Sequence, residues 1–457
     1  MRRLLHALVP LSGLWLCVSA ASCFSSSADP GGGSGAATPG PTTCAILDGG
    51  PPPIAPNGYY TNGSQVCTSS GQSHVFQGVD RDTFEFDPEG QNISLSDFEA
   101  IASWHANVVR VALNQDYWLS DATLYAPDYQ SNIQQAVTWA EQAGLEVILD
   151  LHWSDRGDLT VPQAGGTFPG TTKYVPGDTP GYSVQQPMAD VNSQTFWAQV
   201  AAVFGSDGHV FFELYNEPNG ISWGAWLNGG EVTVNGTTPF MAVGMQELYD
   251  TVRSAGANNL VIIGGLNYAF DLSGVANYPV KGYNIMYATH PYISKGSPSS
   301  WPGAFEYLTI NNIAPVIATE FGDTSTNCTG AFDQELISAA AQPSIHMSWT
   351  AWAWYPDGCS YPALISDWNY DPTVQGQVVM QALSANPAPV PLSGAGSASG
   401  TDAAPSTDGS TVDATLADAA VADGAPASLA DATMADGSDG GAGASTADDA
   451  SDESAEQ

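Results

Sequence analysis

Two glutamates stand at the ends of two apolar segments that share one pattern. The first segment is 211–218 (FFELYNEP) and the second is 315–322 (PVIATEFG). An unpaired charge inside a buried strand is very costly, whereas a carboxylate at the end of a strand can face a cleft and take part in chemistry. The segments therefore predict a pair of carboxylates, Glu217 and Glu320, that converge from two strands of one sheet.

Strand-like and helix-like segments alternate through the middle of the chain. The helical patterns include 94–104, which opens with a plausible N-cap at Ser94, and later segments with apolar residues at helical spacing. The strands that we predict are Val75–Val79, Asn107–Leu113, Glu146–His152, Val210–Glu217, Leu260–Gly264, Asn284–Tyr292, Pro315–Phe321 and Met347–Trp354.

Eight strand–helix units in about 340 residues match the size of a (β/α)8 TIM barrel with long loops. Short, near-continuous apolar strands such as 147–149 suit a parallel sheet buried on both faces. A doubly wound open sheet is the alternative, but no glycine-rich phosphate loop follows any strand. We expect the barrel to be preceded by a short N-terminal β-hairpin near residues 57–63, closed by Cys44–Cys67.

In such barrels the active site lies at the C-terminal ends of the strands. The polar and aromatic residues expected there are Arg110, His152, Asn216, Glu217, His290, Tyr292, Glu320 and one of Trp352 and Trp354. Three of these residues have a structural alternative. The histidines could be satisfied core residues, and Arg110 could be a buried ion-pair partner of Asp150 or Glu213. Glu213 lies four residues deeper than Glu217, so we assign it a structural role.

This set of residues, in barrel order, resembles glycoside hydrolase family 5. The segments 150–153 (DLHW), 186–190 (QPMAD) and 212–218 (FELYNEP) look most like its bacterial cellulases. The resemblance covers roughly residues 57–385. It implies an endo-β-1,4-glucanase that retains the anomeric configuration.

The resemblance also implies roles. Glu217 would be the general acid/base and Glu320 the nucleophile, since retaining enzymes hold two carboxyl groups about 5–5.5 Å apart. At that range the charge on Glu320 should raise the pKa of Glu217. Asn216 would bind the sugar 2-OH. The further substrate-binding residues implied by the resemblance would be Arg110, His152, His290, Tyr292 and the strand-eight Trp354. Trp153 and Trp118 are added because they follow strands, where an aromatic ring can stack on a sugar.

Several loop tryptophans suggest an open cleft for a chain of sugars, because sugar rings stack on aromatic side chains. The same machinery could act on mannan, xyloglucan or another β-glycan. A surface glycan-binding protein on an inactive barrel is the alternative from another class. We expect no cofactor and no catalytic metal, since histidines at metal-ligand spacing are absent. The expected partner is a β-glucan, and the protein is expected to be a monomer.

Charge is concentrated in the C-terminal tail. The formal net charge is -38, and residues 393–457 contain thirteen Asp and Glu and no Lys, Arg or aromatic residue. Such a segment cannot bury enough apolar surface to offset its ordering entropy, so it should be disordered. The rest of the chain is also acidic. Phosphate binding depends on Lys and Arg, so nucleic acid is excluded as the expected partner.

The N-terminus reads as an export signal. Arg2 and Arg3 precede an apolar stretch to about Ala21. The segment 20–23 (AASC) resembles a lipoprotein signal, with lipid attached to Cys23; plain cleavage is the alternative. If Cys23 carries lipid, the four remaining cysteines pair naturally as Cys44–Cys67 and Cys328–Cys359.

The chain thus divides into four predicted parts. They are a signal at 1–22, a Gly/Ser/Pro linker at 23–43, the catalytic barrel at 44–387 and a disordered acidic tail at 388–457. The expected location is outside the cell or on its outer surface.

Overall fold

The computed structural model separates the chain into two units, Met1–Ser397 and Ala398–Gln457. The predicted signal, nearly all of the linker, and the tail from residue 393 lie outside the described residues. No helix among the described residues has the length and apolarity needed to cross a membrane. The described residues are 43–157, 159, 166–167, 174–175, 186–233, 239–324, 329–358 and 361–392.

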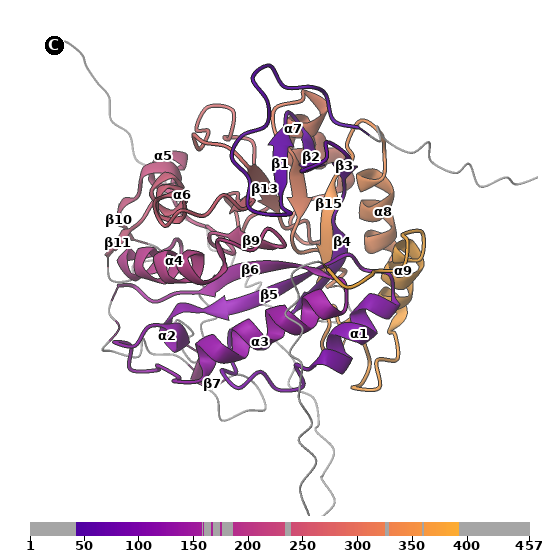
Figure 1. Ribbon diagram of the computed structural model, residues 1–457, viewed down its shortest axis with the longest axis horizontal. Coiled ribbons are helices and arrows are strands. Elements are labelled where there is room, and N and C mark those ends of the chain that lie inside the picture. Colours follow the sequence, from indigo (N-terminus) through magenta and orange to yellow (C-terminus); the bar gives the residue numbers. More distant parts are fainter. Residues whose placement is uncertain are drawn as a thin grey trace, which may run out of the picture. The chain divides into compact units, whose positions relative to one another are not determined.

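A closed barrel of eight parallel strands forms the centre of the first unit (Figure 1). The barrel closes because the last strand pairs with the first, with Trp349 opposite Gln77. This closure confirms the predicted TIM barrel and excludes the doubly wound sheet. In barrel order the strands are β12 (Val261–Gly264), β13 (Ile285–Thr289), β14 (Val316–Ala318), β15 (Ser348–Ala351), β4 (Gln77–Arg81), β5 (Val108–Asn114), β6 (Glu146–Trp153) and β9 (Val210–Glu213).

Helices cover the outside of the barrel (Figure 1). Their apolar faces pack on the strands. In the helix Tyr129–Gln142, for example, Ile133, Val137 and Ala140 are all buried. The predicted N-cap is confirmed, since the Ser94 side chain accepts a hydrogen bond from the Asp97 backbone. The main helices are α1 (Leu95–Ser103), α3 (Tyr129–Gln142), α4 (Val191–Phe204), α6 (Met245–Ser254), α8 (Ala331–Ala340) and α9 (Val374–Leu383).

Shorter elements lie in the loops between strands and helices. They are α2 (Gln115–Trp118), α5 (Trp223–Asn228), α7 (Tyr307–Ile310), the 3₁₀ turn η1 (Pro298–Ser300), the π-turn η2 (Pro302–Glu306) and the strand pairs β7 (Gly166–Thr167) with β8 (Tyr174–Val175) and β10 (Gly230–Val232) with β11 (Phe240–Ala242).

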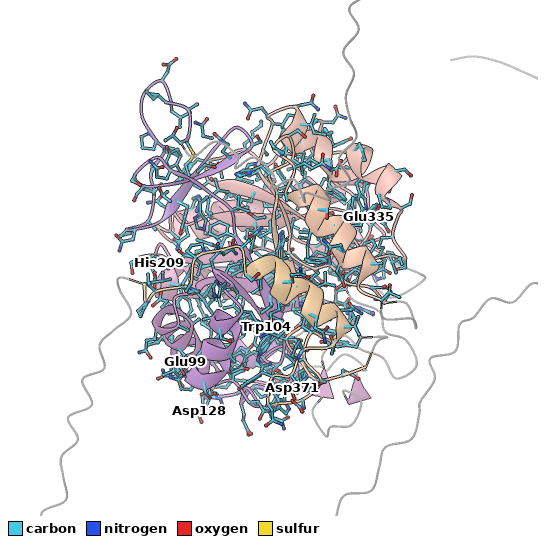
Figure 2. The ribbon with its side chains drawn as sticks, turned by 90° about the vertical axis from the view of Figure 1, so that its right-hand side faces the viewer. Glu99, Trp104, Asp128, His209, Glu335 and Asp371 are labelled. Carbon is cyan, nitrogen blue, oxygen red and sulfur yellow. A yellow bond between two sulfur atoms is a disulfide. The ribbon has the colours of Figure 1, made fainter. Side chains whose placement is uncertain are left out.

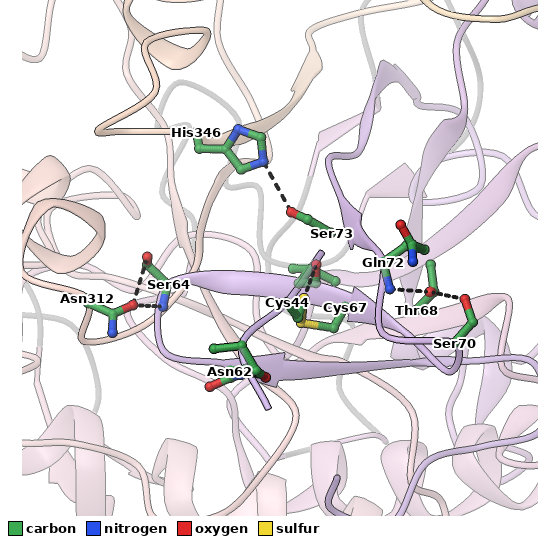
Figure 3. The surroundings of a disulfide bond; sticks show 12 residues. Cys44, Asn62, Ser64, Cys67, Thr68, Ser70, Gln72, Ser73, Asn312 and His346 are labelled. Atoms are coloured by element: carbon green, nitrogen blue, oxygen red, sulfur yellow. Dashed lines mark hydrogen bonds between the residues drawn. A yellow bond between two sulfur atoms is a disulfide. The ribbon is translucent and has the colours of Figure 1, made fainter. Parts of the chain in front are cut away.

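An antiparallel sheet of β1 (Tyr59–Asn62), β2 (Gln65–Thr68) and β3 (Ser73–His74) precedes the barrel. The predicted Cys44–Cys67 disulfide is present (Figure 3). Cys328 and Cys359 lie outside the described residues.

This small sheet closes one end of the barrel. Tyr59, Val66 and Phe76 belong to the same buried cluster as residues from the N-terminal halves of the barrel strands, such as Val108 and Phe211. The Ser64 backbone N–H donates a hydrogen bond to Asn312 Oδ1, and Ser73 bonds to His346, so both bonds also join the sheet to the barrel loops (Figure 3). The opposite end, where the strands terminate, is left for a site.

The outer ring carries much of the charge of the described residues. Glu99, Asp128, Glu335 and Asp371 are exposed on its surface, whereas Trp104 lies against α9 (Figure 2). The Trp104 ring also packs edge to face on Trp354. Apolar side chains of the helices therefore face the barrel, and these four acidic side chains face water.

Candidate active site

Four barrel strands, β9, β13, β14 and β15, end earlier than the sequence predicts. β9 ends at Glu213 and β14 at Ala318, so Glu217 and Glu320 lie in the loops that follow. Backbone bonds still align these loops: the Asn216 N–H donates to Leu151, and Tyr292 bridges to Gly322. The site residues are therefore held by the ends of the strands although they are not in them.

Arg110 on β5 is the centre of the buried part of the site. Its side chain is fully buried and touches four carboxylates and one amide oxygen. These contacts confirm ion pairing with both partners that the sequence suggested, and they add two more. The contacts are Nε to Glu213 at 2.5 Å, Nη1 to Asp80 at 2.9 Å and to Glu320 at 2.8 Å, and Nη2 to Asp150 at 3.0 Å and to Asn216 Oδ1 at 2.7 Å.

One guanidinium cannot neutralise four carboxylates. Burial raises the pKa of Asp80 well above its usual value, and it also raises the pKa of Glu213. The pKa of Asp150 rises to about 7 by burial, although the charge of Arg110 opposes the shift. Burial disfavours the charged form of Arg110, but the surrounding carboxylates outweigh it and raise the pKa of Arg110. These buried carboxylates are therefore protonated more readily than free ones.

Glu217 and Glu320 approach each other across the mouth of the barrel. One carboxylate oxygen of each, together with a nitrogen of His290, lies within 4.8 Å of the others. The Glu217 side chain is 15% exposed and that of Glu320 is 6% exposed. Tyr292 donates to Glu320 Oε2 at 2.7 Å, while Arg110 donates to Oε1. Glu320 is thus held at both oxygens, and Glu217 is the more accessible acid.

His290 connects Glu217 to the interior of the barrel. Its Nδ1 lies 3.0 Å from Glu217 Oε1, and its Nε2 lies 3.0 Å from the Thr319 hydroxyl. Burial lowers the pKa of His290 to about 4, so the imidazole is neutral at neutral pH. His290 is fully buried with both nitrogens in contact, as a satisfied core histidine would be, and one of these contacts is to the accessible Glu217.

His152 and Asn216 form a second polar pair at the mouth. His152 Nδ1 lies 2.8 Å from Asp150, and its Nε2 lies 3.3 Å from the Asn216 amide nitrogen. Burial lowers the pKa of His152 to about 4. The Trp352 ring stacks on His152, with centroids 5.6 Å apart and planes 14° apart. His152 therefore positions both a polar and an aromatic neighbour.

The predicted tryptophans are divided between the site and the core. Trp153 is half-buried beside His152. Trp118 and Trp354 are fully buried and donate their indole N–H groups to Gln199 and Asp97. Their assignment to substrate binding is corrected, because a ring buried on both faces offers nothing to a sugar. Trp226 and Trp301, which the sequence placed in loops, are buried as well.

Of the two tryptophans that follow β15, Trp352 reaches the site and Trp354 does not. In a regular strand the side chains at 352 and 354 would share a face. β15 ends at Ala351, however, so the alternation of a strand does not extend to these two residues. Trp352 is 9% exposed beside His152, whereas Trp354 packs on Trp104 and Tyr370.

Two further side-chain pairs at the mouth were missed. Tyr361 contacts the Trp352 ring and donates a hydrogen bond to the buried Asp82. Tyr268 is 37% exposed, and the Lys295 ammonium lies 3.8 Å from the centre of its ring. The only sequence signal was position, since these residues follow predicted strands without a recognisable motif.

The Tyr268 pair adjoins Glu217. The Tyr268 backbone N–H donates to the carbonyl of Pro218. Burial lowers the pKa of Lys295, and the charge of Glu217 opposes that shift. Tyr268 is the middle one of three consecutive residues, Asn267 to Ala269, with φ near +57°. Such left-handed conformations are rare for these residue types and occur often at functional sites.

Within the described residues, the set with metal-ligand geometry is Glu217, His290 and Glu320. These are the same groups that form the acid pair, and their ligand atoms already contact one another or Tyr292. The expectation of a metal-free site stays a prediction.

Comparison with solved structures identifies the same fold. The β-glucanase of Saccharophagus degradans superposes with a TM-score of 0.56 at 22% identity, over 76% of this chain and 98% of that chain. That enzyme has also been solved in complex with cellotetraose. The hyperthermophilic endocellulase of Pyrococcus horikoshii superposes with a TM-score of 0.52 at 16% identity, over 72% of this chain and 100% of that chain.

Sequence comparison gives named relatives. Endoglucanase E-5 of Thermobifida fusca is 25% identical over 354 residues, which are 74% of this chain and 64% of that protein. Endoglucanase 5 of Pectobacterium carotovorum is 28% identical over 189 residues, 41% of this chain and 29% of that protein. This chain thus spans less than two thirds of the length of these relatives.

The family model that matches is Cellulase (glycosyl hydrolase family 5), over residues 69–358, well over half of the chain. The matched region includes every strand of the barrel and both glutamates. The chain belongs to glycosyl hydrolase family 5 and is an endoglucanase-like glycoside hydrolase by distant homology.

Proposed function

We propose that the protein is a retaining endo-β-1,4-glucanase that hydrolyses cellulose or related β-glucans by double displacement. The observation that carries the proposal is that one carboxylate oxygen of Glu217 lies within 4.8 Å of one carboxylate oxygen of Glu320. Retaining glycosidases hold their carboxyl groups about 5–5.5 Å apart, whereas inverting enzymes need about 6.5–9.5 Å to admit a water molecule. The short separation favours direct attack by one of the two carboxylates.

Glu320 is the nucleophile in this mechanism. Its oxygen attacks the anomeric carbon, the glycosidic C–O bond breaks, and Glu217 gives its proton to the leaving oxygen. Arg110 and Tyr292 each hold one oxygen of Glu320, so the attacking group is oriented before substrate arrives. Its contacts with two fixed donors suit a nucleophile better than an acid that must exchange its proton.

Glu217 then serves as base. It removes a proton from water, whose oxygen attacks the anomeric carbon and releases Glu320. Asn216 is held by Arg110 through its side-chain oxygen, which leaves its amide nitrogen toward His152 and the bound sugar. In that position it can bind the 2-OH, a contact that strengthens in the transition state.

Two observations support a β-glucan chain as substrate. The curated relatives are named endoglucanases, and Trp352, Trp153 and Tyr268 provide aromatic surface at the mouth. Burial of Trp118 and Trp354 leaves fewer sugar platforms than the sequence suggested. Mannan and xyloglucan remain the alternative substrates, because linkage preference depends on the loops. Binding without catalysis is less well supported, since both acids and their partners are present.

For location we propose export, with lipid on Cys23 or plain signal cleavage as the two forms. The support is the basic and apolar N-terminus followed by Ala20–Cys23. Labelled palmitate should be incorporated by the wild-type chain and lost in Cys23→Ser. Incorporation by neither protein would leave plain cleavage, and retention of the N-terminus inside the cell would refute export.

The function is tested with the purified chain on carboxymethylcellulose, mixed-linkage glucan, galactomannan and xylan. We expect release of reducing sugar from the two glucans, and ¹H NMR should show the β-anomer as the first product. Release from mannan or xylan alone would change the substrate, and an α-anomer would refute the retaining mechanism. Folded Glu320→Gln protein is the matched control, because it changes one atom of the nucleophile.

A further inference from the structure

A continuous line of hydrogen-bonding groups runs from Glu217 into the barrel. Glu217 Oε1 lies 3.0 Å from His290 Nδ1, and His290 Nε2 lies 3.0 Å from Thr319 Oγ1. Thr319 Oγ1 in turn lies 2.7 Å from Glu213 Oε1. His290, Thr319 and Glu213 are fully buried, so the line has its accessible end at Glu217. It thus joins the accessible acid of the site to a second carboxyl group in the interior.

Counting hydrogens leaves two arrangements of this line. A neutral imidazole has one N–H, and a hydroxyl has one hydrogen to donate. If Thr319 donates to Glu213, it must accept from His290 Nε2, so Nδ1 is bare and Glu217 must hold the proton. If Glu213 holds the proton, Glu213 donates to Thr319, the Thr319 hydroxyl donates to His290 Nε2, and His290 Nδ1–H donates to Glu217. A line with both acids ionised would set a carboxylate against a nitrogen lone pair.

We propose that Glu217, His290, Thr319 and Glu213 form a proton relay that keeps one proton shared between the two glutamates. The proposal rests on the acid/base role given above to Glu217. In one passage, the Glu217 proton moves to His290 Nδ1, the Nε2 proton moves to Thr319, and the Thr319 proton moves to Glu213. The reverse passage returns it, so no other reactant is needed.

Glu213 is suited to receive this proton. Burial disfavours its charged form, and Arg110 retains Asp80, Asp150 and Glu320 as partners when Glu213 becomes neutral. The charged and titratable groups around the relay come from every neighbouring strand. They are Asp80 (β4), Arg110 (β5), Asp150 and His152 (β6), Tyr215 (after β9), Tyr292 and Lys295 (after β13) and Glu320 (after β14).

The relay matches what double displacement requires of Glu217. The group must be protonated when the leaving oxygen departs and ionised when water attacks. During the reaction Glu217 gives that proton to the leaving oxygen and regains one from the attacking water, so the relay acts on the resting enzyme, where it sets how often Glu217 holds the proton. Thr319 acts through His290 and does not touch the sugar, so it is a positioning residue.

The test compares Thr319→Val, which keeps the shape and loses the hydroxyl, with Thr319→Ser, which keeps the hydroxyl. Thr350→Val is the matched control for structural damage. Its hydroxyl is also buried and donates to the carbonyl of Thr319, outside the relay. Each full-length variant is assayed from pH 4 to 9 on cellotetraose and on 2,4-dinitrophenyl β-cellobioside, whose leaving group needs no proton.

In Thr319→Val, His290 is free to donate from Nδ1, which favours ionised Glu217. We therefore expect kcat/KM on cellotetraose to fall by about tenfold or more, as is typical when general acid catalysis is impaired. The alkaline limb of its pH profile should move to lower pH, while kcat/KM on the dinitrophenyl substrate stays within about twofold. Thr319→Ser and Thr350→Val should keep the wild-type profile. A Thr319→Val profile equal to that of Thr350→Val would overturn the relay.

A second measurement does not depend on activity. In protein with ¹⁵N-labelled histidine, the His290 signals are assigned by their loss in His290→Gln. Exchange between two arrangements predicts nitrogen shifts between those of the two tautomers in the wild type, and shifts of a single tautomer in Thr319→Val. A single tautomer in both proteins would overturn the relay. If the wild type hydrolyses no glycan, the proposed function fails, yet these shifts still decide whether the relay exists.

Discussion

Replacement of Arg110 by Met should destabilise the fold strongly, and more so at high pH. Arg110 is fully buried and within 3.0 Å of Asp80, Asp150, Glu213 and Glu320. Removal of one partner from a buried ion pair costs about 3–5 kcal/mol, because the remaining charge is left without compensation. We expect a loss of that size in the free energy of unfolding at pH 8.

The sign of the pH dependence follows from the raised pKa values. In the wild type, Asp80, Asp150 and Glu213 have folded pKa values above their unfolded values near 4, and that of Asp150 is about 7. A raised acid contributes stability that is fully present below the unfolded pKa and is lost as the pH rises through the folded pKa. Without Arg110 these pKa values rise further, so the loss caused by the mutation shrinks between pH 8 and pH 5.

Urea unfolding at pH 5, 6.5 and 8 measures this difference. Arg253→Met is the control, because Arg253 bonds to backbone carbonyls and lies over the Tyr249 and Tyr283 rings without a carboxylate partner in these contacts. Its cost should not change with pH. A loss below about 1 kcal/mol for Arg110→Met, or an equal loss at pH 5 and pH 8, would refute the reasoning about uncompensated charge.

The other predictions concern turnover, binding and the small sheet. Glu320→Gln should abolish turnover and leave the unfolding midpoint near that of the wild type; near-normal hydrolysis by folded protein would contradict the nucleophile assignment. Glu217→Gln should lose most activity on glucan but little on dinitrophenyl cellobioside in the glycosylation step, and equal losses on both would contradict the acid role. Trp352→Ala should raise KM on cellotetraose roughly five- to tenfold, as expected for loss of one aromatic contact. The kcat of the variant is compared with that of the wild type, because a lower kcat would show that His152 is disturbed. Cys67→Ser, which removes the disulfide, should lower the free energy of unfolding by about 3 kcal/mol, because the bond joins residues 23 positions apart. An unchanged free energy of unfolding would refute this.

Local sequence determines a large part of this protein. Apolar strands interrupted by helical patterns predict the closed barrel, and all eight predicted strands overlap observed ones. The reason is that strand and helix periodicities depend on neighbouring residues, and a buried parallel sheet requires near-continuous apolar runs. The two glutamates follow from the same logic, because a charge is tolerated at the end of such a run and not inside it. The Cys44–Cys67 pairing was also accessible, since both cysteines flank one hairpin.

The limits of the sequence appear at the barrel mouth. A tryptophan after a strand can point to the cleft or to the helices, and Trp352 and Trp354 differ in this although they are two residues apart. β15 ends before them, so the alternation rule for strands no longer applies. Burial of Trp118 depends on Phe196 and Tyr129, which are distant in sequence.

Tertiary structure alone decides which groups interact. Arg110, Glu213, Glu217, His290 and Thr319 come from four strands or their following loops, and no local pattern gives the distances between them. Sequence indicated that Glu213 was structural, yet its Oε1 lies 2.7 Å from the hydroxyl that leads to the proposed acid. Hydrogen bonds and pKa shifts depend on separations of a few tenths of an ångström and on burial. Closure of the barrel sets these separations and this burial. The sequence therefore determines which residue types are present, and the fold determines which of them interact.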